Sequence, residues 1–251
     1  MKRFLGITIV LALAIGLFAC SAPTAAGSAP EQTQQSSVQP SAEPTVETVV
    51  FNDPVLEKMV RAQMNKPEGD ITAEEAQGMK KLEMDIEYRQ EHPAGTQITD
   101  ISALKYFTNL EMLTMQFHAV RDVSPLAGLT KLTSLGLGGN PVGDITPLSG
   151  LKELRFLTLF SCEAADYSPL KNMPYLRTLF AEYSKISDLS VLSGMKDLES
   201  LSLNNTQVSD VTPLAGLTNL KSLKLKDSMV KDYSPLKDIY PNLKDKDFEM
   251  Q

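Results

Sequence analysis

The chain has 251 residues and a formal net charge of −7, with two cysteines and no tryptophan. This length is enough for one or two ordinary domains. Two cysteines are too few for a disulfide-rich scaffold. The acidic balance disfavours nucleic acid as a partner, because phosphate backbones are bound by basic surfaces.

The first 19 residues predict a secretory signal peptide. Lys2 and Arg3 precede an uncharged apolar run over residues 4–18, which is shorter than the ~20 residues of a membrane span. The tetrapeptide LFAC that ends at Cys20 resembles the lipobox of bacterial lipoproteins. That resemblance implies cleavage before Cys20, lipid on its sulfur, and an extracytoplasmic protein anchored to the bacterial cell membrane. An ordinary cleavage site after Ala19 is the alternative.

Residues 20–48 predict a disordered tether behind this cysteine. They contain no lysine or arginine and are rich in serine, proline, glutamine and alanine. Such a composition buries too little apolar surface to offset the entropy of ordering the chain. We therefore expect the folded part to begin at residue 49.

A repeat of 22 residues runs through residues 98–243 without insertion or deletion when rows are started at Ile98. In seven rows the third position is aspartate, the fifth is serine or threonine and the seventh is leucine, and proline is sixth in five rows. The second half of each full row reads L-x-x-L-x-L or a close variant of it. The aspartates are Asp100, Asp122, Asp144, Asp166, Asp188, Asp210 and Asp232.

This pattern resembles the leucine-rich repeat, in the form with D-I-T-P-L that bacterial internalin-type proteins carry. The resemblance implies an α/β solenoid, a horseshoe with parallel strands on the concave face and short helical or 3-10 turns on the convex face. The alternation L-x-L independently predicts a short strand with one buried face. Serine or threonine before Pro-Leu predicts an N-cap followed by the first helical position. Stacked repeats would bury a continuous core that no single repeat can form.

Residues 49–97 predict an N-terminal cap that includes a first, irregular repeat. Asp53 can cap a helix that begins at Pro54, and the segment 72–75, TAEE, fits a capping box that opens a second helix. The segment 79–84 repeats L-x-x-L-x-L and predicts the first strand. The extra residues of this unit are expected in a projecting loop over residues 87–97.

The C-terminal end is expected to be less regular. Residues 239–243 slip the register of the repeat by one, which predicts a C-terminal cap. We expect residues 244–251 to form a frayed, charged tail.

Three glycines after a leucine run, Gly136, Gly138 and Gly139, raise the question of a phosphate loop. The dinucleotide pattern G-x-G-x-x-G fails because its last position is Pro141, and no long helix follows. The repeat instead assigns the glycines to solvent-facing positions of the second strand, where they would leave a hollow. Asn140 is expected to turn inward and satisfy backbone groups at the bend.

The polar residues of the repeat predict structural roles rather than a metal or cofactor site. Calcium needs several oxygens at one point, whereas the aspartates supply one carboxylate per repeat. We expect them to accept backbone N–H bonds in the turns. His118 and Cys162 share the inward position of Asn140, and we expect a hydrogen-bonded histidine and a buried thiol there. Tyr167 and Tyr233 take the isoleucine position of D-I-T-P-L and are expected in the core.

Aromatic residues at outward strand positions predict a ligand-binding surface. The repeat does not need them there for its core, and exposed aromatic clusters mark interaction sites. The alternative is that a cap or the 87–97 loop covers the patch. The candidate ligand-binding residues are Met112, Phe117, Phe156, Phe160, Phe180, Glu182 and Tyr183.

We therefore expect a surface-anchored binding module whose concave face takes a protein or a glycan, from the host or from the envelope. Internalin-type proteins include adhesins that bind host receptors, and the resemblance makes such a role a candidate. A structural spacer of the envelope without a specific ligand is the alternative. An enzyme is disfavoured, since the two histidines and the serines form no Ser-His-Asp arrangement in register.

Overall fold

A computed structural model of the chain describes residues 46–89 and 91–250. The predicted signal peptide, Cys20 and the tether as far as residue 45 lie outside the described residues. Residues before the expected start at residue 49 already belong to the fold, since the Glu47 carbonyl accepts the Ala73 N–H at 2.9 Å. The Val49 N–H donates to the Ile71 carbonyl at 2.8 Å.

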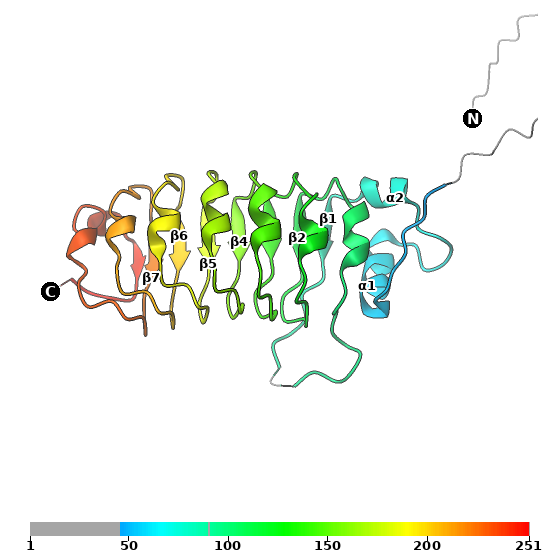
Figure 1. The fold of residues 1–251 in the computed structure, drawn as a ribbon, viewed down its shortest axis with the longest axis horizontal. Coiled ribbons are helices and arrows are strands. Elements are labelled where there is room, and N and C mark those ends of the chain that lie inside the picture. The colour runs from blue at the N-terminus through cyan, green and yellow to red at the C-terminus, as the bar shows by residue number, and fades with distance from the viewer. Residues whose placement is uncertain (1–45, 90, 251) are drawn as a thin grey trace, which may run out of the picture. The chain divides into compact units, whose positions relative to one another are not determined.

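The described residues fold into a single parallel sheet whose strands follow one another in chain order (Figure 1). Each strand is short and is followed by a turn that returns the chain to the start of the next one. This is the predicted leucine-rich-repeat solenoid. The strands are β1 Lys81–Glu83, β2 Met112–Thr114, β3 Ser134–Gly136, β4 Phe156–Thr158, β5 Thr178–Phe180, β6 Ser200–Ser202, β7 Ser222–Lys224 and β8 Asp245–Lys246.

The register places one leucine column at the centre of the sheet. Leu113, Leu135 and Leu157 are paired neighbours, and the same column continues through β7. All of these side chains are fully buried and belong to one continuous hydrophobic core. Each repeat therefore depends on its neighbours for burial, as expected for a solenoid.

Short 3-10 turns cover the side of the core opposite the strands, and their first residue corrects one expectation. The serine or threonine predicted as N-cap is the first residue of the turn in six of seven rows. Its N–H is held by the aspartate two residues earlier, at 2.7 to 2.8 Å in all seven rows. The turns are η1 Ser102–Tyr106, η2 Ser124–Leu126, η3 Thr146–Gly150, η4 Ser168–Asn172, η5 Leu189–Leu192, η6 Thr212–Leu214, η7 Ser234–Leu236 and η8 Tyr240–Asn242.

Two helices close the N-terminal end of the stack, α1 Pro54–Met64 and α2 Ala73–Gly78. Asn65 ends α1 in the left-handed conformation, two residues before Pro67. The predicted capping box of α2 is confirmed, because the Glu75 N–H donates to the Thr72 hydroxyl and the Thr72 N–H donates to the Glu75 carboxylate.

Asp53 joins the cap to the first full repeat. Its Oδ1 accepts the N–H groups of Val55 and Leu56 at 2.8 and 3.0 Å, which caps α1 as the sequence predicts. Its Oδ2 accepts the N–H and the hydroxyl of Thr99 at 2.7 and 3.0 Å, and the Asp100 N–H at 3.2 Å. Burial alone would raise the pKa of this carboxyl, but the bonds from Thr99, Leu56 and Asp100 together hold it below 3.8.

The outer edge of β1 is occupied by a side chain of α1. The Gln63 amide donates to the Glu83 carbonyl at 2.9 Å and accepts the Glu83 N–H at 2.9 Å. One side-chain amide therefore takes the place of a neighbouring strand at this residue.

The C-terminal segment corrects the expectation of a frayed tail. Asp245 and Lys246 pair with Ser222 and Leu223 as β8. Phe248 is buried, and its ring stacks on Tyr233 with centroids 4.6 Å apart and an interplanar angle of 9°. The segment after residue 243 is thus the last layer of the solenoid.

The chain between β1 and η1 leaves the stack as a loop, as predicted for residues 87–97 (Figure 1). Its two ends are tied to the repeat that follows. The Met84 N–H donates to the Thr114 carbonyl at 2.7 Å, and the Ala119 N–H donates to the Ile98 carbonyl at 3.0 Å.

Candidate functional site

The predicted ligand-binding residues lie on the solvent side of the sheet, which we call the strand face. It comprises the outward residues of β1 to β8 and of the segment that follows each strand. Met112, Phe156 and Phe180 lie within β2, β4 and β5 and are half-buried. The remaining four directly follow the strands of their repeats, namely Phe117, Phe160, Glu182 and Tyr183.

The aromatic side chains of the strand face form two groups of contacting rings. The ring centroids of Phe117 and Phe160 are 5.3 Å apart at 51°, and those of Phe156 and Phe180 are 5.8 Å apart at 86°. Tyr88 of the projecting loop extends the first group, with its ring 5.6 Å from that of Phe117. We call these five residues the aromatic patch.

Tyr88 is a member that the sequence analysis missed. The residue is 71% exposed, and its ring extends the patch from Phe117 toward the loop. The only signal in the sequence was an aromatic residue within an insertion that the repeat does not require. Because the Tyr88 ring packs against Phe117, the loop contacts the patch, and the alternative that it covers the patch stays a prediction.

The glycines of β3 do not leave the expected hollow, because aromatic rings fill it. A Cβ atom added to Gly138 would lie 2.1 Å from Phe160 Cε1, and one added to Gly139 would lie 2.5 Å from Phe117 Cδ1. Gly138 is buried as a result, whereas a Cβ atom added to Gly136 would meet Thr114 and no ring. The glycine run thus provides the seat for two rings of the aromatic patch.

One position of the repeat has left-handed backbone in each full row. The φ angles there are positive, between 55° and 73°. Glycine, asparagine and aspartate tolerate this conformation, whereas a bulky side chain is strained in it. Phe117 and Tyr183 nevertheless take this position, at 64° and 55°. The residues of the column are Phe117, Gly139, Ser161, Tyr183, Asn205 and Asp227.

Replacing Tyr183 by asparagine is expected to stabilise the fold. The ring is 65% exposed and contributes little packing, while Asn205 adopts the same backbone one repeat later at φ 57°. Relief of the strain should raise the free energy of unfolding by about 1 kcal/mol. Urea denaturation of the parent and the Tyr183→Asn variant measures the difference.

The matched control is Tyr175→Asn, at a tyrosine that is 50% exposed and lies outside the left-handed column. This control should show no gain in stability. Equal effects of the two substitutions would mean that backbone strain is not the cause.

The inward position of the turn ties neighbouring repeats together, as predicted. Asn140 Oδ1 accepts the Val120 N–H at 3.1 Å, and its amide donates to the carbonyls of Met115 and Leu137 at 2.8 and 2.9 Å. In the preceding row His118 Nδ1 accepts the Ile98 N–H at 3.0 Å, and its Nε2 lies 2.6 Å from the Met84 carbonyl.

His118 therefore needs to be neutral to close the base of the projecting loop. Only the tautomer with the proton on Nε2 can accept from Ile98 and donate to Met84. Burial lowers its pKa below 6.5, and this outweighs the opposing effects of the Met84 carbonyl and of the charges on Asp85 and Asp53.

The stability of the fold is consequently expected to fall as the pH drops below about 6.5. The unfolded histidine binds a proton there and the folded one does not, which costs at most about 1.4 kcal/mol per pH unit for one proton. Urea denaturation at pH 7.5 and 5.5 measures the loss. His118→Asn, which copies Asn140, should show less pH dependence over this range, and an unchanged dependence would contradict the role of His118.

Cys162 takes the same inward position and is buried, as predicted. Its thiol lies 3.7 Å from the Leu137 carbonyl. Burial raises the pKa of this thiol to about 12, so the thiolate needed for a nucleophile is scarce at neutral pH. Tyr167 is buried in the core as expected, and Tyr233 is half-buried beneath Phe248.

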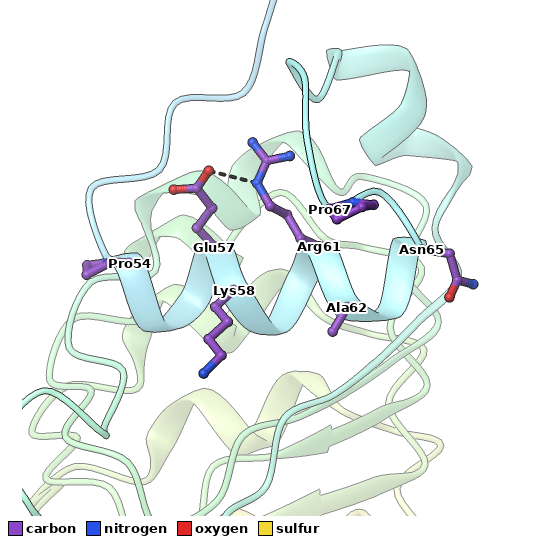
Figure 2. A pocket seen from close by; sticks show the side chains of 7 residues that line it. All are labelled: Pro54, Glu57, Lys58, Arg61, Ala62, Asn65 and Pro67. Atoms are coloured by element: carbon purple, nitrogen blue, oxygen red, sulfur yellow. Dashed lines mark hydrogen bonds and ion pairs between the residues drawn. The ribbon is translucent and has the colours of Figure 1, made fainter.

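An open hollow of about 640 Å³ lies on the outer side of α1, away from the predicted site (Figure 2). Arg61 forms an ion pair with Glu57 at 2.8 Å and donates to the Gly69 carbonyl at 2.9 Å. This arginine thus serves the cap, and Lys58 points away from the pair (Figure 2). We assign no ligand to this hollow.

No group of three or more His, Cys, Asp or Glu side chains with the geometry of a metal site occurs in residues 46–89 and 91–250. No helix within the same ranges is long and apolar enough to cross a membrane.

Comparison with known proteins agrees with the architecture. The family model described as Leucine Rich repeats (2 copies) matches residues 174–216, and the fold and its repeats make the chain a leucine-rich-repeat protein. No curated protein matches it. Two crystal structures from Listeria monocytogenes are similar to it, an internalin (inlF) and an internalin (inlC2).

The first internalin is 34% identical with a TM-score of 0.73, and the match covers 80% of this chain and 58% of that one. The second is 28% identical with a TM-score of 0.63, and the match covers 82% of this chain and 98% of that one. The chain thus spans little more than half the length of the first internalin. Its leucine-rich-repeat fold is similar to that of these internalins, and this fold supports a protein–protein interaction module.

Proposed function

We propose that the chain binds a protein partner through the aromatic patch of its strand face. The observation that carries the proposal is the placement of large rings at outward positions, where the core does not use them. Phe156, Phe160 and Phe180 are only half-buried although their repeats are fully packed beneath them. Aromatic side chains of this kind are the residues that contribute most to protein interfaces.

Backbone strain supports the same proposal. Phe117 and Tyr183 occupy the left-handed column at φ 64° and 55°. Sites that keep a strained residue despite a tolerated alternative are often functional. Asn205 and Asp227 show that this fold accepts the tolerated alternative.

The proposal includes a lipid anchor on Cys20, which lies outside the described residues. Its support is the apolar signal and the LFAC tetrapeptide. The lipid would hold the domain to the outer side of the bacterial cell membrane, at the end of the tether that follows Cys20. A Cys20→Ser variant should lose incorporation of labelled palmitate and leave the membrane fraction, whereas retention of both would contradict the anchor.

The geometry favours a protein over a glycan as the partner. A sugar ring stacks on an open, flat aromatic face. The rings of the patch are instead tilted against one another by 51° to 86°, so that they form no single flat platform. A spacer without a ligand would not need these rings.

Among the described residues, the buried thiol of Cys162 and the hydrogen-bonded imidazole of His118 offer no free nucleophile or base for catalysis.

The proposal is tested by capture of partners from envelope and host-cell extracts on residues 44–251, whose described residues form one compact unit. The comparison is a variant with Phe156, Phe160 and Phe180 all replaced by alanine. We expect at least one protein to be retained by the parent domain and lost by the variant. Treatment of the extracts with glycosidases should leave that capture unchanged.

Two controls make the outcome specific. The triple variant must still melt cooperatively, because loss of Phe160 removes a ring that packs on Gly138. Tyr175→Ala removes an exposed aromatic side chain outside the strand face and should retain the partner. If the triple variant captures the same proteins as the parent, the aromatic patch is not the binding site.

A further inference from the structure

Glu182 is the acidic residue at the centre of the candidate site. It follows β5 and lies in the column between Phe160 and Asn204. Backbone bonds fix this order, since the Ser161 N–H donates to the Glu182 carbonyl at 2.8 Å and the Tyr183 N–H donates to the Asn204 carbonyl at 2.9 Å. Aromatic residues therefore adjoin Glu182 across the sheet and along its own repeat.

The carboxylate of Glu182 has no partner among the described residues. Its Oε2 is enclosed by neighbouring atoms and accepts no hydrogen bond there, and no lysine or arginine nitrogen of residues 46–89 and 91–250 lies within 4.0 Å. Lys226 is in the same column but two strands away, which is about 10 Å at the spacing of a sheet. The Lys226 ammonium forms no ion pair with Glu182.

Other carboxylates of the strand face are paired within the chain. Glu83 pairs with Lys81 at 2.9 Å, and Asp245 pairs with Lys224. Asp85 accepts the Gln116 N–H at 2.7 Å. Asp227, which follows β7, also has no such partner among the described residues, but it is exposed, whereas Glu182 is half-buried.

A half-buried carboxylate beside aromatic rings favours a cation from outside. Partial burial removes water from the charge, which is costly unless the charge is paired. A basic side chain would form charge-assisted hydrogen bonds with the carboxylate and could also lie against the face of a neighbouring ring. The guanidinium of arginine suits both contacts, because it is planar and presents several donors.

We propose that Glu182 is the recognition point for a basic side chain, arginine in preference to lysine, presented by the protein partner of the strand face. This inference rests on the proposed function and specifies the chemistry of the partner. Phe160, Phe180 and Tyr183 contact the stem and the neighbours of that basic residue. The net charge of −7 also favours approach of a basic surface.

The probe for this proposal is a displayed library of short random peptides, selected on the immobilised domain of residues 44–251. We expect the enriched peptides to carry an arginine or lysine flanked by apolar residues. One enriched peptide is then synthesised with arginine and with citrulline, its neutral isostere. The citrulline peptide should bind about tenfold more weakly or worse, which corresponds to about 1.4 kcal/mol.

The variant Glu182→Gln completes the test, because it removes the charge and keeps the shape. It should bind the arginine peptide as weakly as the parent binds the citrulline peptide, and it should no longer distinguish the two. Glu153→Gln, at an exposed residue outside the strands, makes the same change in net charge and should bind like the parent.

The outcomes separate this inference from the proposed function. Enriched peptides without a basic residue, equal binding of the arginine and citrulline peptides, or unchanged binding by Glu182→Gln would each overturn the role of Glu182. In those cases loss of binding in the phenylalanine variant would still support the aromatic patch. If no peptide is enriched at all, the recognition point is wrong as stated, whereas capture from extracts tests the patch separately.

Discussion

Replacing Asp53 by alanine is expected to lower the free energy of unfolding by about 3 kcal/mol. The substitution removes the N-cap of α1, which is worth about 1 kcal/mol. It also leaves the N–H groups of Thr99 and Asp100 without their acceptor, and an unpaired, partly buried donor costs about 1–3 kcal/mol. Urea denaturation at neutral pH measures the change.

Two further variants test whether this loss comes from the N-cap of α1 and from the bonds that join Asp53 to the first full repeat. Asp53→Asn keeps one acceptor oxygen and should cost about half as much, because one side of the bridge is retained. Asp70→Ala changes an exposed aspartate of the same cap region and should be nearly neutral. A loss below about 1 kcal/mol for Asp53→Ala would contradict the argument, since the cap alone accounts for that amount.

The second large expected effect is a loss of binding affinity, caused by the single methyl group that Gly138→Ala adds. In Gly138→Ala the new Cβ atom would lie 2.1 Å from Phe160 Cε1, so the ring must leave its seat. That movement breaks the contact of Phe160 with Phe117, whose centroids are 5.3 Å apart. Affinity for the partner captured by the parent domain should fall about tenfold or more, as for loss of an interface anchor.

The fold itself should survive this substitution, because the displaced group is a partly exposed side chain at the surface of the sheet. A cost of about 1–3 kcal/mol is expected from the overpacking. The matched control is Gly143→Ala, where the added Cβ atom meets no other atom within 4 Å. If Gly138→Ala binds as tightly as this control, the seated ring of Phe160 is not part of the interface.

Much of the fold follows from the spacing of residues along the chain. Leucines at fixed intervals could only be buried by stacking, and Asp53-Pro54 and the capping box at Thr72 predicted both cap helices. The N-cap assignment was wrong because each turn offers two residues that can cap, an aspartate and a hydroxyl residue. Where the turn begins depends on the backbone of the residue between these two. In the first row this residue is Ile101, whose angles of φ −112° and ψ 18° are not helical, so the turn begins after it.

The last strand could not be found from the pattern. In β8 the central leucine of the column is replaced by Lys246, which pairs with Leu223. The Lys244 N–H donates to the Lys221 carbonyl, one residue beyond the repeat spacing. Pairing with β7 and the stacking of Phe248 on Tyr233 form this strand, and neither is visible as alternation in the sequence.

The sequence predicted which residues lie at the candidate site but not how their side chains pack against one another. Periodicity alone assigned Phe156, Phe160 and Phe180 to the outward side of the strands. It could not show that the ring of Phe160 turns onto Gly138, because this depends on the side-chain rotamer. The contribution of Tyr88 depends on the path of an irregular loop, which no repeat constrains.

The Gln63 amide, which bonds to both backbone groups of Glu83, covers part of the outer edge of β1. A parallel sheet of similar strands is an open template, and a free edge can accept the strand of another molecule. Here the N–H and C=O of Glu83, which a further strand would need, are already bound to one side chain. Gln63 therefore occupies the backbone groups of Glu83 through which a strand of another molecule would pair with β1.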